Sequence, residues 1–158
     1  MRVGVISDTH GLLRPEAERV LRGVDLILHA GDVGNPQILE RLKAIAPVFA
    51  VRGNVDTEPW ARELPETTVV QTESVSFYML HNLRALDLRP EAAGFQAVIS
   101  GHTHQAEQWE HDGVLYLNPG SAGPKRFQLP VTLALIDLGT TPWKVELINL
   151  TQYECRES

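Results

Sequence analysis

The stretch RVGVISDTH at residues 2–10 opens the repeating pattern that decides the fold. Its apolar part, residues 2–7, predicts a buried strand that ends at the polar residue Asp8. The pattern continues with a helix signal at 15–22, a strand signal at 25–30, a helix signal at 36–45 and a strand signal at 47–52. A proline opens each helix signal, a position that tolerates this residue. The β-α-β-α-β series predicts a parallel sheet with right-handed crossovers.

The remainder of the chain carries mainly strand signals. They lie at 67–71, 75–80, 97–100, 106–110, 114–117, 131–138 and 144–150. The first two are expected to pair, the last two to form an antiparallel pair, and His-Asp-Gly at 111–113 is a strong hairpin signal. A short helix is expected between Asn82 and Ala93. We therefore expect an α/β protein with two sheets packed face to face and helices outside.

Length and composition bound the class of protein. The 158 residues favour one domain spanning 1–158, and its oligomeric state stays open, a homo-oligomer included. A net charge of −6 makes a nucleic-acid partner unlikely without excluding a phosphorylated substrate, because bound metal ions can reverse the local field. The single cysteine, Cys155, is interpreted as an incidental thiol. An early Asp8 argues against a signal peptide, and no apolar run approaches the roughly 18–20 residues of a membrane span. We expect a cytoplasmic protein.

Side chains that can bind metal follow five of the strand signals. They are Asp8 and His10, Asp32, Asn54 and Asp56, His81, and His102 and His104. Ligands of open α/β sheets bind beyond the carboxyl ends of the strands, so five segments should deliver these groups to one edge. Residues two apart on an extended chain point the same way, so Asp8 and His10 can hold one metal. Carboxylate, imidazole and amide ligands together favour Mn, Fe, Zn or Ni over Ca or Mg.

Each motif taken alone has an ordinary structural explanation, and only the ordered set points to chemistry. Gly-Asp and Gly-Asn are common turn dipeptides. The glycines at 31, 53 and 101 suggest close approach of the backbone to a ligand. Two further histidines are interpreted otherwise: His29, inside the apolar run LILHA, as a hydrogen-bonded core residue, and His111 as a solvated turn residue.

The ordered set Asp-x-His, Gly-Asp, Gly-Asn-x-Asp, His and Gly-His-x-His resembles the signature of the calcineurin-like metallophosphoesterase superfamily. The chain looks most like its small, single-domain bacterial and archaeal phosphodiesterases. The resemblance runs from residue 1 to about 124 and includes LNPGS at 117–121, which these enzymes also carry. It implies a four-layer αββα sandwich of two mixed β-sheets flanked by helices, and two divalent transition-metal ions per chain, with Mn ahead of Fe, Zn and Ni.

The resemblance also implies a role for each site residue. One metal would be held by Asp8, His10 and His104, the other by Asn54, His81 and His102, with Asp32 bridging both. A hydroxide bridging the two ions would then attack a small phosphate ester, most plainly a diester, although a monoester or a cyclic nucleotide stays open. Asn54, His81 and Asp56 are the catalytic candidates. Asn54 could point its amide at a phosphate oxygen, and Asp56 could orient a histidine or simply stabilise a turn.

Two positions depart from the family pattern. Relatives often carry a histidine that assists the leaving group where this chain has Val55, and a glycine where it has Asn82. Substrates with good leaving groups should therefore be favoured. The segment 118–121 could present amides to an anion or be a plain turn, and Lys125 with Arg126 could steer phosphate or be a solvated pair. The segment 56–65, with Trp60 and Arg62, could shape a pocket.

Two rival functions share the fold that the resemblance implies. The retromer complex contains a subunit of this fold and similar length that serves as a protein-binding platform, so a non-catalytic scaffold is the alternative function. Degenerate ligands would favour it, yet all seven ligand positions are filled here. The second rival is a nuclease like the double-strand-break repair enzyme of this superfamily, which the short acidic chain disfavours.

Overall fold

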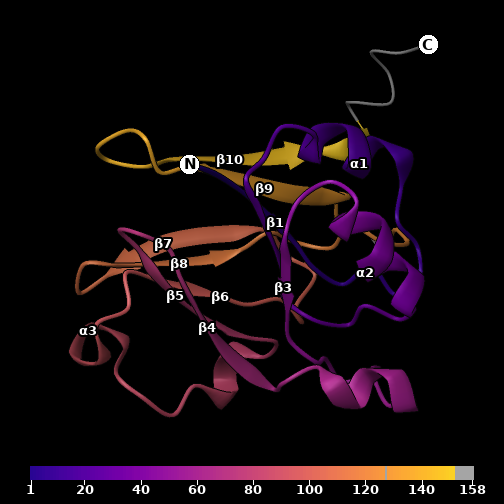
Figure 1. Cartoon of the computed structure of the whole chain (residues 1–158), viewed down its shortest axis with the longest axis horizontal. Helices are drawn as coiled ribbons and strands as arrows, with labels where there is room; N and C mark the ends of the chain where they lie inside the picture. The colour runs from indigo at the N-terminus through magenta and orange to yellow at the C-terminus, as the bar shows by residue number, and fades with distance from the viewer. Residues whose placement is uncertain (127, 152–158) are drawn as a thin grey trace.

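A computed structural model describes residues 1–126 and 128–151, whose strands form two mixed five-stranded sheets (Figure 1). The first sheet has the order β10 (Lys144–Asn149), β9 (Thr132–Asp137), β1 (Arg2–Ile6), β2 (Leu26–His29), β3 (Val48–Ala50). The second has the order β4 (Thr67–Gln71), β5 (Ser76–Leu80), β6 (Ala97–Ile99), β8 (Val114–Asn118), β7 (Glu107–His111). Strands β1, β2 and β3 run parallel, as do β5, β6 and β8. The parallel series expected from the sequence is therefore confirmed.

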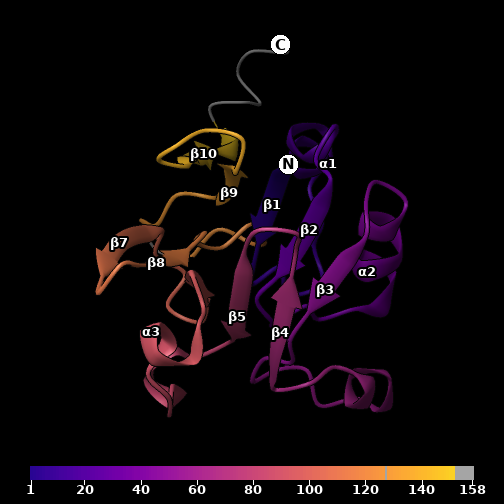
Figure 2. The same ribbon diagram turned by 60° about the vertical axis from the view of Figure 1, so that its left-hand side comes forward.

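Helices cover the outer faces of both sheets. They are α1 (Pro15–Leu21) and α2 (Pro36–Lys43), the 3₁₀ segments η1 (Pro59–Glu63) and η2 (Leu83–Ala85), and α3 (Pro90–Ala93). Figure 2 shows α1 and α2 beside the first sheet and α3 on the opposite side of the molecule, next to the second sheet. The αββα layering is therefore confirmed. No helix among the described residues has both the length and the apolar character that crossing a membrane requires.

The helix expected between Asn82 and Ala93 is two short pieces. Asn82 caps η2 by accepting a hydrogen bond from the Arg84 backbone N–H at 3.0 Å. Pro90 then opens α3, and its ring disfavours helical geometry at the preceding Arg89, which is extended. A single helix through this region is therefore excluded by the proline.

Three apolar layers follow from the alternation of side chains along the strands. In β5, Phe77 and Met79 point into the layer between the sheets, whereas Tyr78 and Leu80 point outward beneath η2 and α3. The third layer lies under α1 and α2, where Leu21 is fully buried. Burial on both faces explains why the sequences of central strands such as β1 and β2 are short continuous apolar runs.

The expected strand pairs are present. Strands β4 and β5 pair, and β9 pairs antiparallel with β10. Strands β7 and β8 meet at a two-residue turn, Asp112-Gly113, whose φ angles of 50° and 78° are those of a hairpin turn. Cys155 lies outside the described residues.

Candidate metal centre

The loops that follow the parallel strands of both sheets meet at one edge of the sandwich. Backbone hydrogen bonds join them within each sheet: Asp8 N–H donates to the Gly31 carbonyl, and Gly101 N–H donates to that of His81, both at 2.9 Å. Between the sheets, the His102 N–H donates to Oδ2 of Asp8 at 3.1 Å. The topology thus brings together segments that lie far apart in the sequence.

Five of the predicted ligands adopt left-handed backbone geometry. The φ angles are 55° at Asp8, 46° at His10, 54° at Asp32, 75° at His102 and 65° at His104. The expectation that Asp8 and His10 converge along an extended chain is therefore wrong, because tight turns orient these side chains instead. Residues with a Cβ avoid this region, and such strain persists mainly where surrounding contacts enforce it, often at functional sites.

One cluster of donor atoms is formed by Asp8, His10 and His104. Oδ1 of Asp8 lies 3.8 Å from Nε2 of His10 and 3.5 Å from Nε2 of His104. The two Nε2 atoms face each other at 3.3 Å. Two imidazoles and a carboxylate that converge in this way match the mixed nitrogen and oxygen ligands that transition metals accept.

A second cluster shares Asp8 and adds Asp32 and His81. Oδ2 of Asp32 lies 3.1 Å from Nε2 of His81 and 3.5 Å from Nε2 of His10. Nε2 of His81 is also 3.9 Å from Oδ1 of Asp8. Oδ2 of Asp32 therefore lies between a histidine of one cluster and a histidine of the other.

Each of the two carboxylates has one oxygen held by the protein and one directed into the clusters. Oδ2 of Asp8 accepts hydrogen bonds from the Ser7 hydroxyl at 2.7 Å and the His102 N–H, while Oδ1 is buried without a hydrogen-bond partner among the described residues. Oδ1 of Asp32 accepts from the Val55 N–H at 3.0 Å. A buried acceptor without a partner costs about 1–3 kcal/mol, a cost that a bound cation removes.

The tautomer of His81 also suits a metal. Its Nδ1 donates to the Ala30 carbonyl at 2.7 Å, because a carbonyl oxygen can only accept. In the neutral ring, Nε2 then carries the lone pair, and this buried atom has no hydrogen-bond partner within the described residues. A carbonyl behind a ligating histidine is the usual means of fixing its orientation. These donors fit a divalent cation.

Electrostatics tie Asp32 to His81. Burial alone would raise the pKa of Asp32, but the facing His81 and the Val55 N–H hold it well below its usual value. Burial would lower the pKa of His81, but the Asp32 carboxylate and the Ala30 carbonyl raise it. For His104, burial dominates over the attraction of Asp8 and lowers the pKa. A cation and a proton therefore compete for Nε2 of His81, which makes cation binding pH-dependent.

Asn54 and His102, also predicted as ligands, lie at the open side of the centre. Both residues are exposed, and the His102 ring is 5.2 Å from the His81 ring in an edge-on arrangement. Asn54 lines a cavity of about 460 Å³ together with His81. The centre is thus buried on the side of Asp8 and open on the side of Asn54 and His102.

The glycines before the ligands allow the loops to touch. A Cβ at Gly53 would collide with the backbone of Asp32, and one at Gly101 would collide with Oγ of Ser7. At Gly31 the φ angle is 101° and a Cβ would lie 2.7 Å from Nδ1 of His81. The close approach expected from these glycines is present.

The structure places the Asp56 carboxylate against backbone amides. It accepts hydrogen bonds from the N–H groups of Val33 at 3.2 Å, Gly34 at 3.0 Å and Gly53 at 2.9 Å. These contacts join the loops after β2 and β3, which corresponds to the turn-stabilising alternative for Asp56. The neighbouring Val55 side chain is 48% exposed and has no proton to give.

A layer of bracing residues around the centre was not assigned from the sequence. Ser121 Oγ donates to the Asp8 carbonyl at 3.0 Å. Asn118 Nδ2 donates to the Gly101 carbonyl at 3.0 Å, and its Oδ1 accepts from the Gly120 N–H at 2.9 Å. The segment 118–121 is therefore a turn, as expected, that also holds two ligand loops. The motif LNPGS was the available signal.

His29 is the hydrogen-bonded core residue that the sequence indicates. Its Nδ1 accepts from the Gly31 N–H at 3.1 Å, and its Nε2 then donates to Thr9 Oγ1 at 3.1 Å. The Thr9 hydroxyl in turn donates a hydrogen bond to the Val33 carbonyl at 2.8 Å. Complete burial lowers the pKa of His29 to about 4, so this bridge between two ligand loops is neutral.

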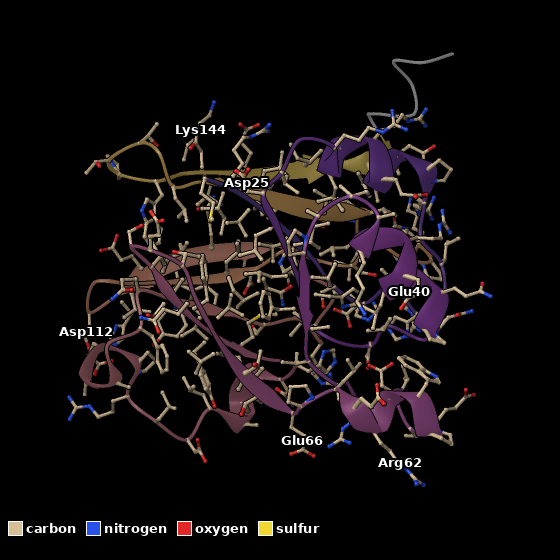
Figure 3. All side chains as sticks on the ribbon, in the orientation of Figure 1. Asp25, Glu40, Arg62, Glu66, Asp112 and Lys144 are labelled. Carbon is tan, nitrogen blue, oxygen red and sulfur yellow. The ribbon has the colours of Figure 1, made fainter. Side chains whose placement is uncertain are left out.

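The remaining candidates lie outside the two clusters, although Arg126 is near enough to His104 that its charge, after burial, contributes to the lowered pKa of that histidine. Trp60 packs partly buried against the apolar layer under α1 and α2. Figure 3 shows Arg62 directed away from the body of the protein, and this residue is exposed. His111, Lys125 and Arg126 are exposed as well.

Fold and site together define a metallophosphoesterase-type sandwich, and comparison with known proteins gives the family. Residues 1–141 match the calcineurin-like phosphoesterase superfamily domain. A probable metallophosphoesterase of Methanothermobacter thermautotrophicus is 39% identical in an alignment 150 residues long, and the match covers 85% of this chain and 85% of that protein. The chain therefore belongs to the calcineurin-like phosphoesterase superfamily.

Solved structures share the fold at lower identity. The structure of a novel archaeal phosphodiesterase has a TM-score of 0.78 and 23% identity, covering 94% of this chain and 100% of that one. Vps29 of Entamoeba histolytica, complexed with Zn²⁺, has a TM-score of 0.71 and 23% identity, covering 95% and 99% of the two chains. Both an enzyme and a sorting protein are thus built on this sandwich.

Proposed function

We propose that this chain is a dinuclear metal-dependent phosphodiesterase, with Mn²⁺ as the foremost metal, acting on a small phosphate ester. The observation that carries the proposal is the unpaired Oδ1 of Asp8, buried among three converging imidazoles. The family supports it, and so does the archaeal phosphodiesterase of the same fold.

Asp8, His10 and His104 would hold one ion, and the other would be held by Asn54, His81 and His102, with Asp32 bridging. When bound, the ions supply positive charge to the phosphoryl oxygens and acidify a water. The Ala30 carbonyl keeps the proton of His81 on Nδ1, so that Nε2 can ligate. The exposed Asn54 amide is available to a phosphate oxygen. Because Val55 cannot protonate a leaving group, esters of acidic alcohols such as nitrophenol should react fastest.

The test is metal analysis of the pure protein together with hydrolysis of bis(p-nitrophenyl) phosphate. His102→Ala and Asp8→Asn should each lower kcat/KM by more than about 100-fold, the scale of losing preorganised charge stabilisation. His111→Ala and Asp112→Asn change the same residue types at the exposed hairpin and should leave turnover unchanged. Wild-type turnover in either centre variant would refute the assignment.

A protein-binding platform is the alternative function, and the likeness to Vps29 favours considering it. The two functions differ in one measurement. A platform would hydrolyse no phosphate ester, so replacing the Asp8 carboxylate would change no catalytic rate. Metal-loaded protein without turnover on phosphodiesters and phosphomonoesters would therefore support the platform.

A further inference from the structure

A cavity of about 520 Å³ opens beside the exposed His102, on the side of the second sheet away from the first. Its lining includes Asn82, Arg84, His102, Glu107, Trp109 and Asn118. The volume lies in the range of small-molecule sites. His102 and Asn118 place it in direct continuity with the loops of the candidate centre.

Trp109 supplies the one large aromatic surface in this lining. It lies on the edge strand β7 and is 39% exposed. Its ring stacks on that of the buried Tyr116, with centroids 5.3 Å apart and planes only 7° from parallel. The contact holds the indole as a flat platform, and ring stacking is favourable beyond the burial of area alone.

The charged side chains of the cavity lining balance each other. Arg84 and Glu107 bring one positive and one negative charge, and neither forms an ion pair with any residue between 1–126 or 128–151. The cavity on the other side of the centre, which Asn54 lines, holds Asp87 beside an ion pair of Arg52 with Glu66 at 3.1 Å, and so carries one net negative charge. Trp109 does not line that cavity. A neutral ring is therefore better matched to the Trp109 side.

We propose that this cavity is the subsite for an aromatic arm of the phosphate ester, an aryl or heterocyclic ring stacked on Trp109 while the phosphoryl group lies at the centre. The inference rests on the proposed function and names the substrate class within it. Trp109 is then a specificity-determining residue that lies outside the set of metal ligands.

The test uses two phosphonates that the protein cannot hydrolyse at their carbon–phosphorus bond. Calorimetry on the Mn²⁺-loaded protein should give a lower Kd for phenylphosphonate than for methylphosphonate. Trp109→Ala should raise the Kd of phenylphosphonate about tenfold and that of methylphosphonate less than about twofold, as loss of one stacking contact predicts. Trp109→Phe should restore most of the preference. His111→Ala, on the same strand and outside the lining, should leave both constants unchanged.

The possible outcomes separate the two levels of the proposal. If neither phosphonate binds the metal-loaded wild type, the proposed function fails together with the subsite. If both bind equally well, or if Trp109→Ala weakens both alike, only the subsite is wrong. Should Trp109→Ala lower the melting temperature of the protein, Trp109→Leu replaces it, because leucine keeps the apolar bulk without the aromatic face. Loss of the preference for phenylphosphonate over methylphosphonate in Trp109→Leu supports the subsite, and an unchanged ratio of the two Kd values overturns it.

Discussion

Among the described residues, left-handed backbone at residues other than glycine occurs in two regions, and the two regions use it differently. At the hairpin between β7 and β8, Asp112 has a φ of 50° and is followed by a glycine, and both are exposed. At the candidate metal centre, Asp8 and Asp32 have φ values of 55° and 54° and are buried. Asp-Gly is a sequence that adopts positive φ angles in a hairpin turn without support from other parts of the chain. The centre is instead held by contacts between loops, and its unpaired atoms leave it incomplete without a ligand.

The largest effect should come from metal binding itself. Adding Mn²⁺ at about 1,000 times its Kd should stabilise the wild type by about 4.1 kcal/mol in urea unfolding. Asp8→Asn should abolish this gain, since it replaces a charged ligand with a neutral amide. Asp112→Asn is the matched control at the hairpin and should keep the gain in full. Equal metal stabilisation of both variants would contradict the distinction between the regions.

Acid should destabilise the centre through His29. Its pKa is lowered from 6.5 to about 4 in the folded protein, so the unfolded chain binds a proton at a higher pH. Unfolding therefore takes up a proton between these values, and stability falls as pH falls through this window. The loss should total about 3 kcal/mol, with no effect above about pH 7.

Other groups titrate in the same range, so a variant must isolate this one. His29→Gln should flatten the pH dependence of unfolding between pH 4 and 6.5 relative to the wild type. The difference between the two urea-unfolding curves is the quantity to measure. Identical pH profiles would show that His29 does not carry the effect. The exposed His111 offers the control, since removing it should change neither profile.

The layers of this fold could be predicted from the sequence because buried strands appear there as short apolar runs. Short apolar runs such as 2–7 and 25–30 became strands, and their ends carry the ligands. Pro15 was correctly predicted to begin a helix. The interruption before Pro90, which divides the region into η2 and α3, was not predicted, because the helix signal there is too short to show a boundary.

The geometry of the centre could not be predicted in the same way. The φ angle of Asp8 depends on contacts from His102 and Ser121, which lie 94 and 113 residues further along the chain. No local pattern records such contacts. His29 was interpreted correctly because an apolar run surrounds it, whereas Asn118 lies in a turn motif whose bracing role depends on its partner Gly101.

Alanine substitution should cost more stability at a glycine of the candidate centre than at the hairpin glycine, because only the former is closely packed. Gly101→Ala places a Cβ against Oγ of Ser7 and 2.7 Å from Oδ2 of Asp8, so overpacking should cost about 2 kcal/mol and weaken metal binding. Gly113→Ala meets nothing within 4 Å, and its φ of 78° should cost only about 1 kcal/mol. Urea unfolding with and without Mn²⁺ measures both terms. Weakened metal binding in the hairpin variant would contradict this picture.

The smallest effect concerns Ser121, which contacts the backbone of Asp8 but none of the candidate metal-binding atoms. Ser121→Ala removes a buried hydrogen bond to the Asp8 carbonyl and should cost about 1 kcal/mol. Because this bond sets the position of a left-handed residue, the Kd for Mn²⁺ should rise about tenfold, as for other residues that orient ligands. Thr140→Ala removes an exposed hydroxyl bond to Pro142 and should change neither quantity. A loss of stability in Ser121→Ala with unchanged metal affinity would mean that the Asp8 turn is maintained by the remaining contacts alone.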